Sequence, residues 1–142
     1  SIACHRILRL GTGATKPRLC EGRPASVATE EHPGRVCDTL AGEGRRVLVL
    51  FRDNAAWHVS QRVRRWIARH NRRVTRDKKG CRIRECGLPI EAPWLNRIEP
   101  EWVHGKRAAG EPDRKLTADE LRGRIHAYYG CPRHPRLSKA QA

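Results

Sequence analysis

The chain has 142 residues and a formal net charge of +15 at pH 7, and 38% of its residues are hydrophobic. This length and apolar content are enough to bury the core of one domain, which argues against wholesale disorder. A charge this high favours polyanions, chiefly nucleic acid, because basic side chains neutralise phosphates and release their counterions. Most of the basic residues are arginines, which suit phosphate, although GC-rich coding DNA produces the same excess.

The sequence contains no pattern that predicts membrane insertion or export. No run of about 20 apolar residues occurs, so we expect no transmembrane helix. No basic-then-apolar signal segment opens the chain. The six cysteines form no C-x-x-C pair, and we interpret them as mostly reduced thiols of a cytoplasmic protein.

The first third of the chain predicts a hairpin followed by a helix. Residues 2–10 alternate loosely between apolar and polar side chains, which is typical of a strand, and residues 17–22 suit a short antiparallel partner. Residues 26–44 are compatible with a helix, although Pro33 limits where that helix can start. Gly44 lies where the helix would end.

The middle of the chain predicts two further strands with a helix between them. Residues 46–52 contain a continuous apolar run, which suits a central strand buried on both faces. An apolar stripe predicts an amphipathic helix over about 58–70, and residues 71–80 are expected to form a basic loop. Residues 81–86 alternate again as a short strand.

The last third predicts two helices. A Pro-containing segment leads into a helix that should end near Gly110. Thr117 and Glu120 then form a T-x-x-E capping box at the start of the final helix. The whole order is strand, strand, helix, strand, helix, strand, helix, helix, which predicts an α/β fold with helices covering a sheet.

A first candidate site follows the apolar strand, in residues 53–58, which read DNAAWH. Asp53 would lie at the carboxyl end of that strand, where open α/β sheets collect ligands. Burying an isolated carboxylate is costly, so Asp53 should face solvent, a hydrogen-bond donor or a cation. The alternative is that Asp53 is only the N-cap of the next helix.

A second candidate site lies in residues 88–102, which read LPIEAPWLNRIEPEW. This rigid segment delivers Glu99 to the start of a helix. Pro100 favours the first helical position, so Glu99 could instead be an N-cap that interacts favourably with the helix dipole.

Together and in this order, the two blocks resemble the DDE transposases of the mariner-like superfamily, in its bacterial insertion-sequence branch. The downstream segments HGKRA and YYGC are also similar to that branch, so the resemblance extends over roughly residues 3–131. It implies a partial RNase H-like catalytic domain over residues 1–131, with a mixed sheet and flanking helices, followed by a basic tail at 132–142. The first strand of that fold has no match in this chain.

The resemblance also implies the chemistry. Members of the family cleave DNA and join strands with two Mg²⁺ or Mn²⁺ ions, which lie about 3.5–4 Å apart and are held by carboxylates. Asp53 corresponds to the second acid and Glu99 to the third, with Asn54, His58 and Asn96 near the site. The implied partners are transposon ends and target DNA, in a bacterial, nucleoid-associated protein that could act as a homodimer.

The chain departs from the family pattern at three places. The first catalytic acid has no counterpart, because no acid before Asp53 lies in a strand that matches its position, so we expect the chain to be inactive alone. Arg97 replaces the usual proline, which removes no ligand. Arg52 replaces an apolar residue directly before Asp53, where its cation could pair with that carboxylate and compete with metal.

Basic residues between the two blocks predict a surface that contacts the DNA backbone, with a solvated basic face as the alternative. The expected DNA-binding residues are Arg64, Arg65, Arg69, Arg72, Arg73, Arg76, Lys78, Lys79, Lys106 and Arg107. The four tryptophans could stack on bases, although the position of Trp66 on the apolar stripe favours a place in the core.

Three alternatives remain open from the sequence. A zinc site could use Cys81, Cys86, Cys131 and His134, although only the second pair has suitable spacing. The chain could be a non-catalytic, basic DNA-binding remnant of a mobile element. It could also be a small α/β domain without a nucleic-acid role, whose charge reflects coding bias alone.

Overall fold

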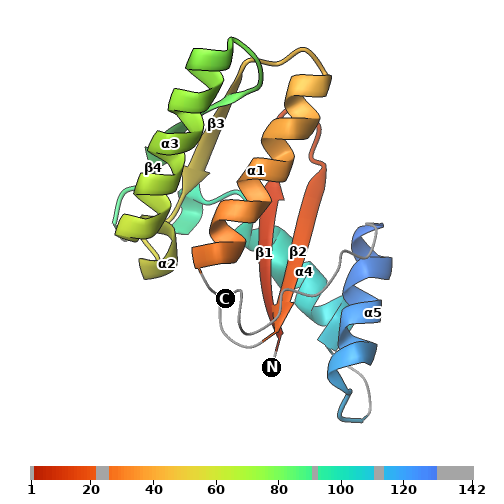
Figure 1. Cartoon of the computed structure of the whole chain (residues 1–142). Coiled ribbons are helices and arrows are strands. Elements are labelled where there is room, and N and C mark those ends of the chain that lie inside the picture. Colours follow the sequence, from red (N-terminus) through yellow and green to blue (C-terminus); the bar gives the residue numbers. More distant parts are fainter. Residues whose placement is uncertain (1, 22–25, 91–92, 111–113, 131–142) are drawn as a thin grey trace. The chain divides into compact units, whose positions relative to one another are not determined.

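The structure, a computed structural model, describes residues 2–21, 26–90, 93–110 and 114–130 (Figure 1). The chain is mixed α/β, as predicted. Its elements in chain order are β1 (Ile2–Leu8), β2 (Thr15–Glu21), α1 (Ser26–Gly42), β3 (Val47–Arg52), α2 (Ala56–Val59), α3 (Gln61–Asp77), β4 (Arg82–Gly87), the 3-10 helix η1 (Pro93–Leu95), α4 (Glu99–Gly110) and α5 (Ala118–Tyr129).

The elements divide into two compact units. Unit 1 comprises Ser1–Pro24 and Arg97–Ala142, and unit 2 comprises Ala25–Asn96. The described strands form two separate two-stranded sheets, one in each unit, and not the single mixed sheet that the sequence predicted.

Unit 1 contains the predicted hairpin. Strands β1 and β2 are antiparallel, with His5 opposite Arg18, and the turn between them is closed by a 2.8 Å hydrogen bond from the Arg9 amide to the Ala14 carbonyl. Gly13 lies in this turn at a φ of 69°, a left-handed conformation that favours glycine. The capping box at the start of α5 is also confirmed, because Thr117 and Glu120 exchange both of its hydrogen bonds.

An arginine surrounded by aromatic rings connects β1 to the helices of unit 1. The Arg6 guanidinium lies 4.8 Å from the ring centre of Trp102 on α4 and 4.5 Å from that of Tyr129 on α5. Arg6 also donates a hydrogen bond to the Tyr129 hydroxyl, which in turn donates one to the Glu101 carbonyl over 3.2 Å. Cation–π contacts and hydrogen bonds thus join three elements at one point.

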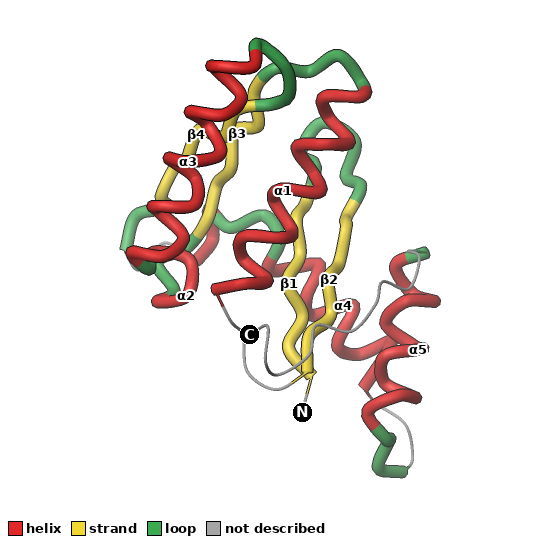
Figure 2. The backbone as a smooth tube through the Cα atoms, in the orientation of Figure 1, coloured by secondary structure: helices red, strands yellow, loops and turns green. Residues whose placement is uncertain are grey.

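Unit 2 contains the hydrophobic core. Strands β3 and β4 are parallel, with Leu48 opposite Ile83, and helices α1 and α3 pack against this pair and against each other (Figures 1 and 2). Side chains from α1, α3 and the β4 region form the buried core, which consists of Cys37, Val63, Ile67, Cys81 and Ile83. The partly buried Leu48, Leu50 and Trp66 pack against it.

Strand β3 is not buried on both faces, so that prediction was wrong. Val47, Val49 and Phe51 are 42%, 51% and 54% exposed, whereas Leu48 and Leu50 point into the core. Side chains alternate between the two faces of a strand, and the helices of unit 2 pack against only one of them. Apolar composition alone does not distinguish a strand covered on one face from a strand covered on two.

The predicted basic loop at 71–80 is also wrong, because most of it is helical. Ser60 is the N-cap of α3 and separates it from the short α2. The buried stripe of α3 continues through His70 and Val74, and the helix ends where Lys78 adopts a φ of 50°. The arginines of this segment lie on the exposed side of a longer amphipathic helix.

Helix α3 covers the outer edge of β4 with polar side chains. Asn71 accepts a hydrogen bond from the Ile83 amide and donates one to the Ile83 carbonyl, each over 2.8 Å. The ring of His70 lies 2.8 Å from the Cys81 carbonyl. These side chains satisfy backbone groups that a neighbouring strand would otherwise pair with.

Pro33 does not limit the start of α1, because it lies inside this helix. Proline lacks an amide hydrogen, so the helix loses one backbone hydrogen bond at that residue and nevertheless continues. Beyond its end, Gly44 adopts a φ of 77° and the Arg45 amide donates to the Leu40 carbonyl over 2.8 Å.

Candidate functional site

Asp53 follows directly after β3, at the carboxyl end of the parallel pair. Its side chain is 49% exposed, and its carboxylate accepts a 3.1 Å hydrogen bond from the Ala55 amide. The N-cap of α2 is Ala55, which has no side-chain cap, so the alternative of Asp53 as an N-cap is wrong. The carboxylate instead stabilises a local turn and keeps exposed oxygen surface for another ligand.

His58 lies beside Asp53, with 3.7 Å between its Nε2 atom and the carboxylate. Burial lowers the pKa of His58 below its usual value of 6.5, and the nearby cation of Arg52 acts in the same direction, while Asp53 opposes both. The imidazole is therefore neutral at pH 7, and a neutral imidazole can accept a hydrogen bond or bind a cation.

Arg52 does not pair with Asp53, contrary to the sequence expectation. Its guanidinium forms an ion pair with Glu85 on β4 and donates a hydrogen bond to the His58 carbonyl. Arg52 and Asp53 are adjacent in an extended segment, so their side chains leave it in different directions. The Asp53 carboxylate is therefore left for solvent and His58, and Arg52 instead holds α2 close to β4.

Asn54 connects the turn after β3 to the segment after β4. Its side-chain amide donates a 3.0 Å hydrogen bond to the Leu88 carbonyl, and the Leu88 amide donates a 2.9 Å bond to the Arg52 carbonyl. These two bonds fasten the carboxyl ends of both strands together. Asn54 therefore positions the turn that carries Asp53.

Glu99 is the first residue of α4, one residue later in the helix than the N-cap position considered from the sequence, and its side chain is exposed. It belongs to unit 1, whereas Asp53, Asn54, His58 and Asn96 belong to unit 2. The structure brings Asp53 and His58 together within unit 2. The described residues contain no group of three or more His, Cys, Asp and Glu side chains that could hold a metal ion.

The thiols give little support to the zinc alternative. Cys81 lies in the core with Cys37, and burial raises the pKa of the Cys37 thiol to about 12 and also raises that of Cys81. Zinc binds the thiolate form, which burial disfavours. The other expected ligands, Cys131 and His134, lie outside the described residues, as does the tail at 132–142.

The predicted DNA-binding residues are all exposed. Those on and directly after α3 are Arg64, Arg65, Arg69, Arg72, Arg73, Arg76, Lys78 and Lys79, and those on α4 are Lys106 and Arg107. Arg76 pairs with Asp77 over 2.7 Å. Within the described part of the chain, Arg64, Arg65, Arg69 and Arg72 have no carboxylate within ion-pair distance. Helix α3 therefore presents a face of uncompensated positive charge.

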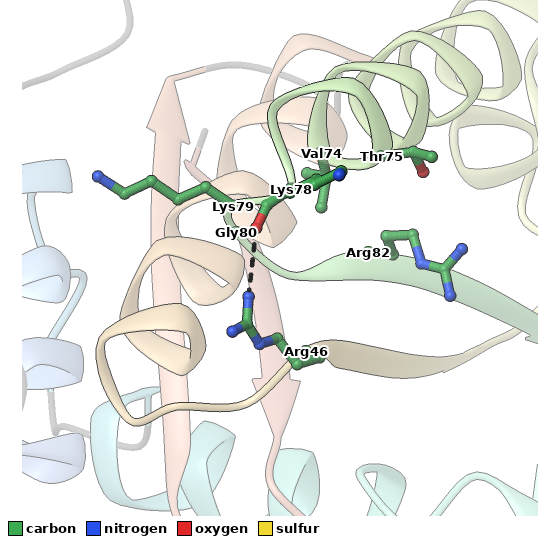
Figure 3. Close-up of a pocket in the computed structure, with 7 residues that line it drawn as sticks. All are labelled: Arg46, Val74, Thr75, Lys78, Lys79, Gly80 and Arg82. Carbon is green, nitrogen blue, oxygen red and sulfur yellow. Dashed lines mark hydrogen bonds between the residues drawn. The ribbon is translucent and has the colours of Figure 1, made fainter.

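Two basic residues next to this face were not predicted from the sequence. Arg46 precedes β3 and Arg82 begins β4, and together with Lys78 and Lys79 they line a depression of about 200 Å³ at the turn between α3 and β4 (Figure 3). The two strands are parallel, so their amino ends meet at one edge. A parallel pairing of the two predicted strands would have been enough to bring these arginines together.

The tryptophans differ in their surroundings. Trp66 packs against the core, as expected, and Trp102 contacts Arg6. Trp94 is 76% exposed, and the side chain of Trp57 lies outside the description. None of the described helices is both long and apolar enough to cross a membrane.

A comparison of the chain with protein-family models, with curated proteins and with solved structures found no match in any of the three.

Proposed function

We propose that this chain carries part of the catalytic domain of a DDE-type transposase, which cleaves DNA and transfers strands with Mg²⁺ or Mn²⁺. The observation that carries the proposal is the setting of Asp53. It is an exposed carboxylate at the carboxyl end of a parallel strand, next to a neutral His58, and the neighbouring Arg52 pairs with Glu85 instead of Asp53. This chemistry suits a ligand for a hard divalent cation.

In this proposal the chain supplies two of the three acids. Asp53 and Glu99 would hold the metal ions, which would supply activation of the attacking oxygen and charge stabilisation for the leaving oxygen of the scissile phosphate. Asn54 holds the turn that carries Asp53, and His58 and Asn96 lie near the reacting groups. A preceding strand that ends in Asp would supply the first acid.

An RNase H-like arrangement is the finer part of the proposal. The chain contains, in order, an antiparallel hairpin, a helix and two parallel strands separated by a helix. This order supports such an arrangement. Asp53 and Glu99 would then converge on one metal cluster.

A cleavage assay tests the catalytic proposal. A longer chain, in which a strand ending in Asp precedes the present residues, should nick duplex DNA when Mg²⁺ or Mn²⁺ is added. Asp53→Asn and Glu99→Gln should each abolish nicking, because each removes a metal ligand. Asp38→Asn is a matched control on the exposed surface of α1 and should retain activity. Activity that survives Asp53→Asn would contradict the proposed site.

A second candidate function is a basic DNA-binding remnant without catalysis. The uncompensated arginines on α3 favour this alternative, since they need no metal to bind phosphate. Both functions predict binding to duplex DNA with little sequence preference and with affinity that falls steeply as salt rises. Replacing Arg72, Arg73 and Arg76 by Ala should flatten that salt dependence in fluorescence anisotropy. Metal titration separates the two, because only the catalytic function requires ions at Asp53.

A further inference from the structure

The depression at the α3–β4 turn is surrounded by cations that come from three parts of unit 2. Arg46 lies before β3, Lys78 and Lys79 form the turn, and Arg82 begins β4. A helix dipole favours cations at the carboxyl end of α3, which accounts for the lysines. It does not account for Arg46 and Arg82, because neither belongs to the helix.

Among the residues that the structure describes, no carboxylate compensates these charges. The acid next to the turn in sequence, Asp77, is engaged by Arg76 at 2.7 Å. Throughout the described residues, none of the four cations that line the depression has an acidic group within ion-pair distance. Four like charges around one depression repel one another, and an anion would relieve that repulsion.

The directions of the side chains indicate an extended anion. Arg46 donates a 3.5 Å hydrogen bond to the Lys78 carbonyl, which holds its guanidinium against the turn. Lys79 and Arg82 extend away from each other on either side of the depression (Figure 3). Such a divergent set does not enclose a single phosphate, whereas it can contact successive phosphates that pass over the turn.

We propose that Arg46, Lys78, Lys79 and Arg82 form a binding site for the phosphodiester backbone of duplex DNA. The choice of DNA as the polyanion rests on the proposed function. Arg46 and Asp53 stand at opposite ends of β3, and seven residues of extended chain span about 23 Å. This separation corresponds to about 7 base-pair steps. The site therefore holds DNA that flanks the phosphate at Asp53 and takes no part in the reaction.

The test compares two double variants of the 142-residue chain by fluorescence anisotropy with a duplex over a range of salt concentrations. Arg46→Gln with Arg82→Gln removes two charges from the depression. Arg45→Gln with Arg124→Gln removes two exposed charges that do not line the depression and is the matched control. The first variant should reduce the magnitude of the log–log salt slope by about 1.8, since each lost phosphate contact contributes about 0.9. The control should keep the slope of the unmodified chain.

A second measurement needs no substitution. Adding DNA to the unmodified chain should shift the amide NMR signals of Thr75 and Gly80, which line the depression. Equal slopes for both double variants, or unshifted Thr75 and Gly80 signals in a chain that binds DNA, would overturn this site and leave the proposed function standing. Failure of the unmodified chain to bind DNA would overturn both. Equal binding of polyglutamate through Arg46 and Arg82 would assign the site to an acidic protein instead.

Discussion

At the scale of single residues, the charge of His58 reports directly on Asp53. Burial lowers the pKa of His58, and the Asp53 carboxylate raises it. We expect the pKa of His58 in the folded chain to lie below 6.5, and we expect Asp53→Asn to lower it further, because the stabilising negative charge is lost. NMR titration of the imidazole would measure both values. An unchanged pKa in the variant would show that the two side chains do not interact.

The same pKa shift determines a pH dependence of stability. Between the lowered folded pKa and the unfolded value near 6.5, the unfolded chain binds more protons at His58 than the folded chain does. The contribution of His58 is therefore fully present above pH 6.5 and is lost as the pH falls through the folded pKa. Urea unfolding at pH 7.5 and pH 5.5 should show a smaller pH effect in His58→Gln than in the unmodified chain.

Unit 1 has no room for a side chain at Gly105. A Cβ atom added there would overlap the Tyr129 hydroxyl, and that hydroxyl is held by hydrogen bonds to Arg6 and the Glu101 carbonyl. We expect Gly105→Ala to lower the free energy of unfolding by about 1–3 kcal/mol, as overpacking does. Gly110→Ala is the control, because a Cβ atom at that position meets open space. Equal thermal stability of the two variants would refute the close contact.

At the scale of elements, Asn71 determines how α3 sits along the edge of β4. Its two hydrogen bonds satisfy both backbone groups of Ile83. We expect Asn71→Ala to reduce the free energy of unfolding by about 1–3 kcal/mol per unsatisfied buried group, less where water replaces the side chain. Thr75→Ala, at an exposed position on the same helix, should have little effect. Hydrogen exchange at the Ile83 amide should accelerate only in the first variant.

Local sequence patterns were sufficient to predict some elements and their boundaries but not others. The hairpin, β3, β4 and the capping box at Thr117 were predicted from alternation, apolar runs and capping residues, which act over a few residues. The full length of α3 was not predicted. A dense run of basic residues is typical of a loop when the segment against which the helix packs is unknown. Val74 continues the buried stripe of α3, and its burial depends on its contact with the turn at Gly80 in the folded chain.

At the scale of the whole molecule, the proposed function depends on a third carboxylate besides Asp53 and Glu99. Two divalent cations repel each other and need several carboxylates, and in the proposed function this chain supplies only Asp53 and Glu99. We therefore predict no DNA nicking by the 142-residue chain with Mg²⁺ or Mn²⁺. Nicking that disappears in Asp53→Asn would reveal a site formed by other residues.

Weak binding of a single Mn²⁺ ion would still report on how the two acids are placed. If Asp53 and Glu99 converge, the paramagnetic ion should broaden the amide NMR signals around both residues at the same Mn²⁺ concentration. Signals around Asp38 on α1 serve as the internal control. Broadening near only one of the two acids would contradict a shared metal cluster and favour the non-catalytic function.

The sequence by itself determined the α/β class, the order of the strands and helices and the position of Asp53 after β3, because these depend on the residues within each segment. It also determined that the α3 region is strongly basic. Tertiary structure decided which face of β3 is covered, that Arg52 pairs with Glu85 and not Asp53, and that Arg46 and Arg82 share one depression. Each of these depends on contacts between segments far apart in the chain, and strand pairing and helix packing bring them together only in the folded state.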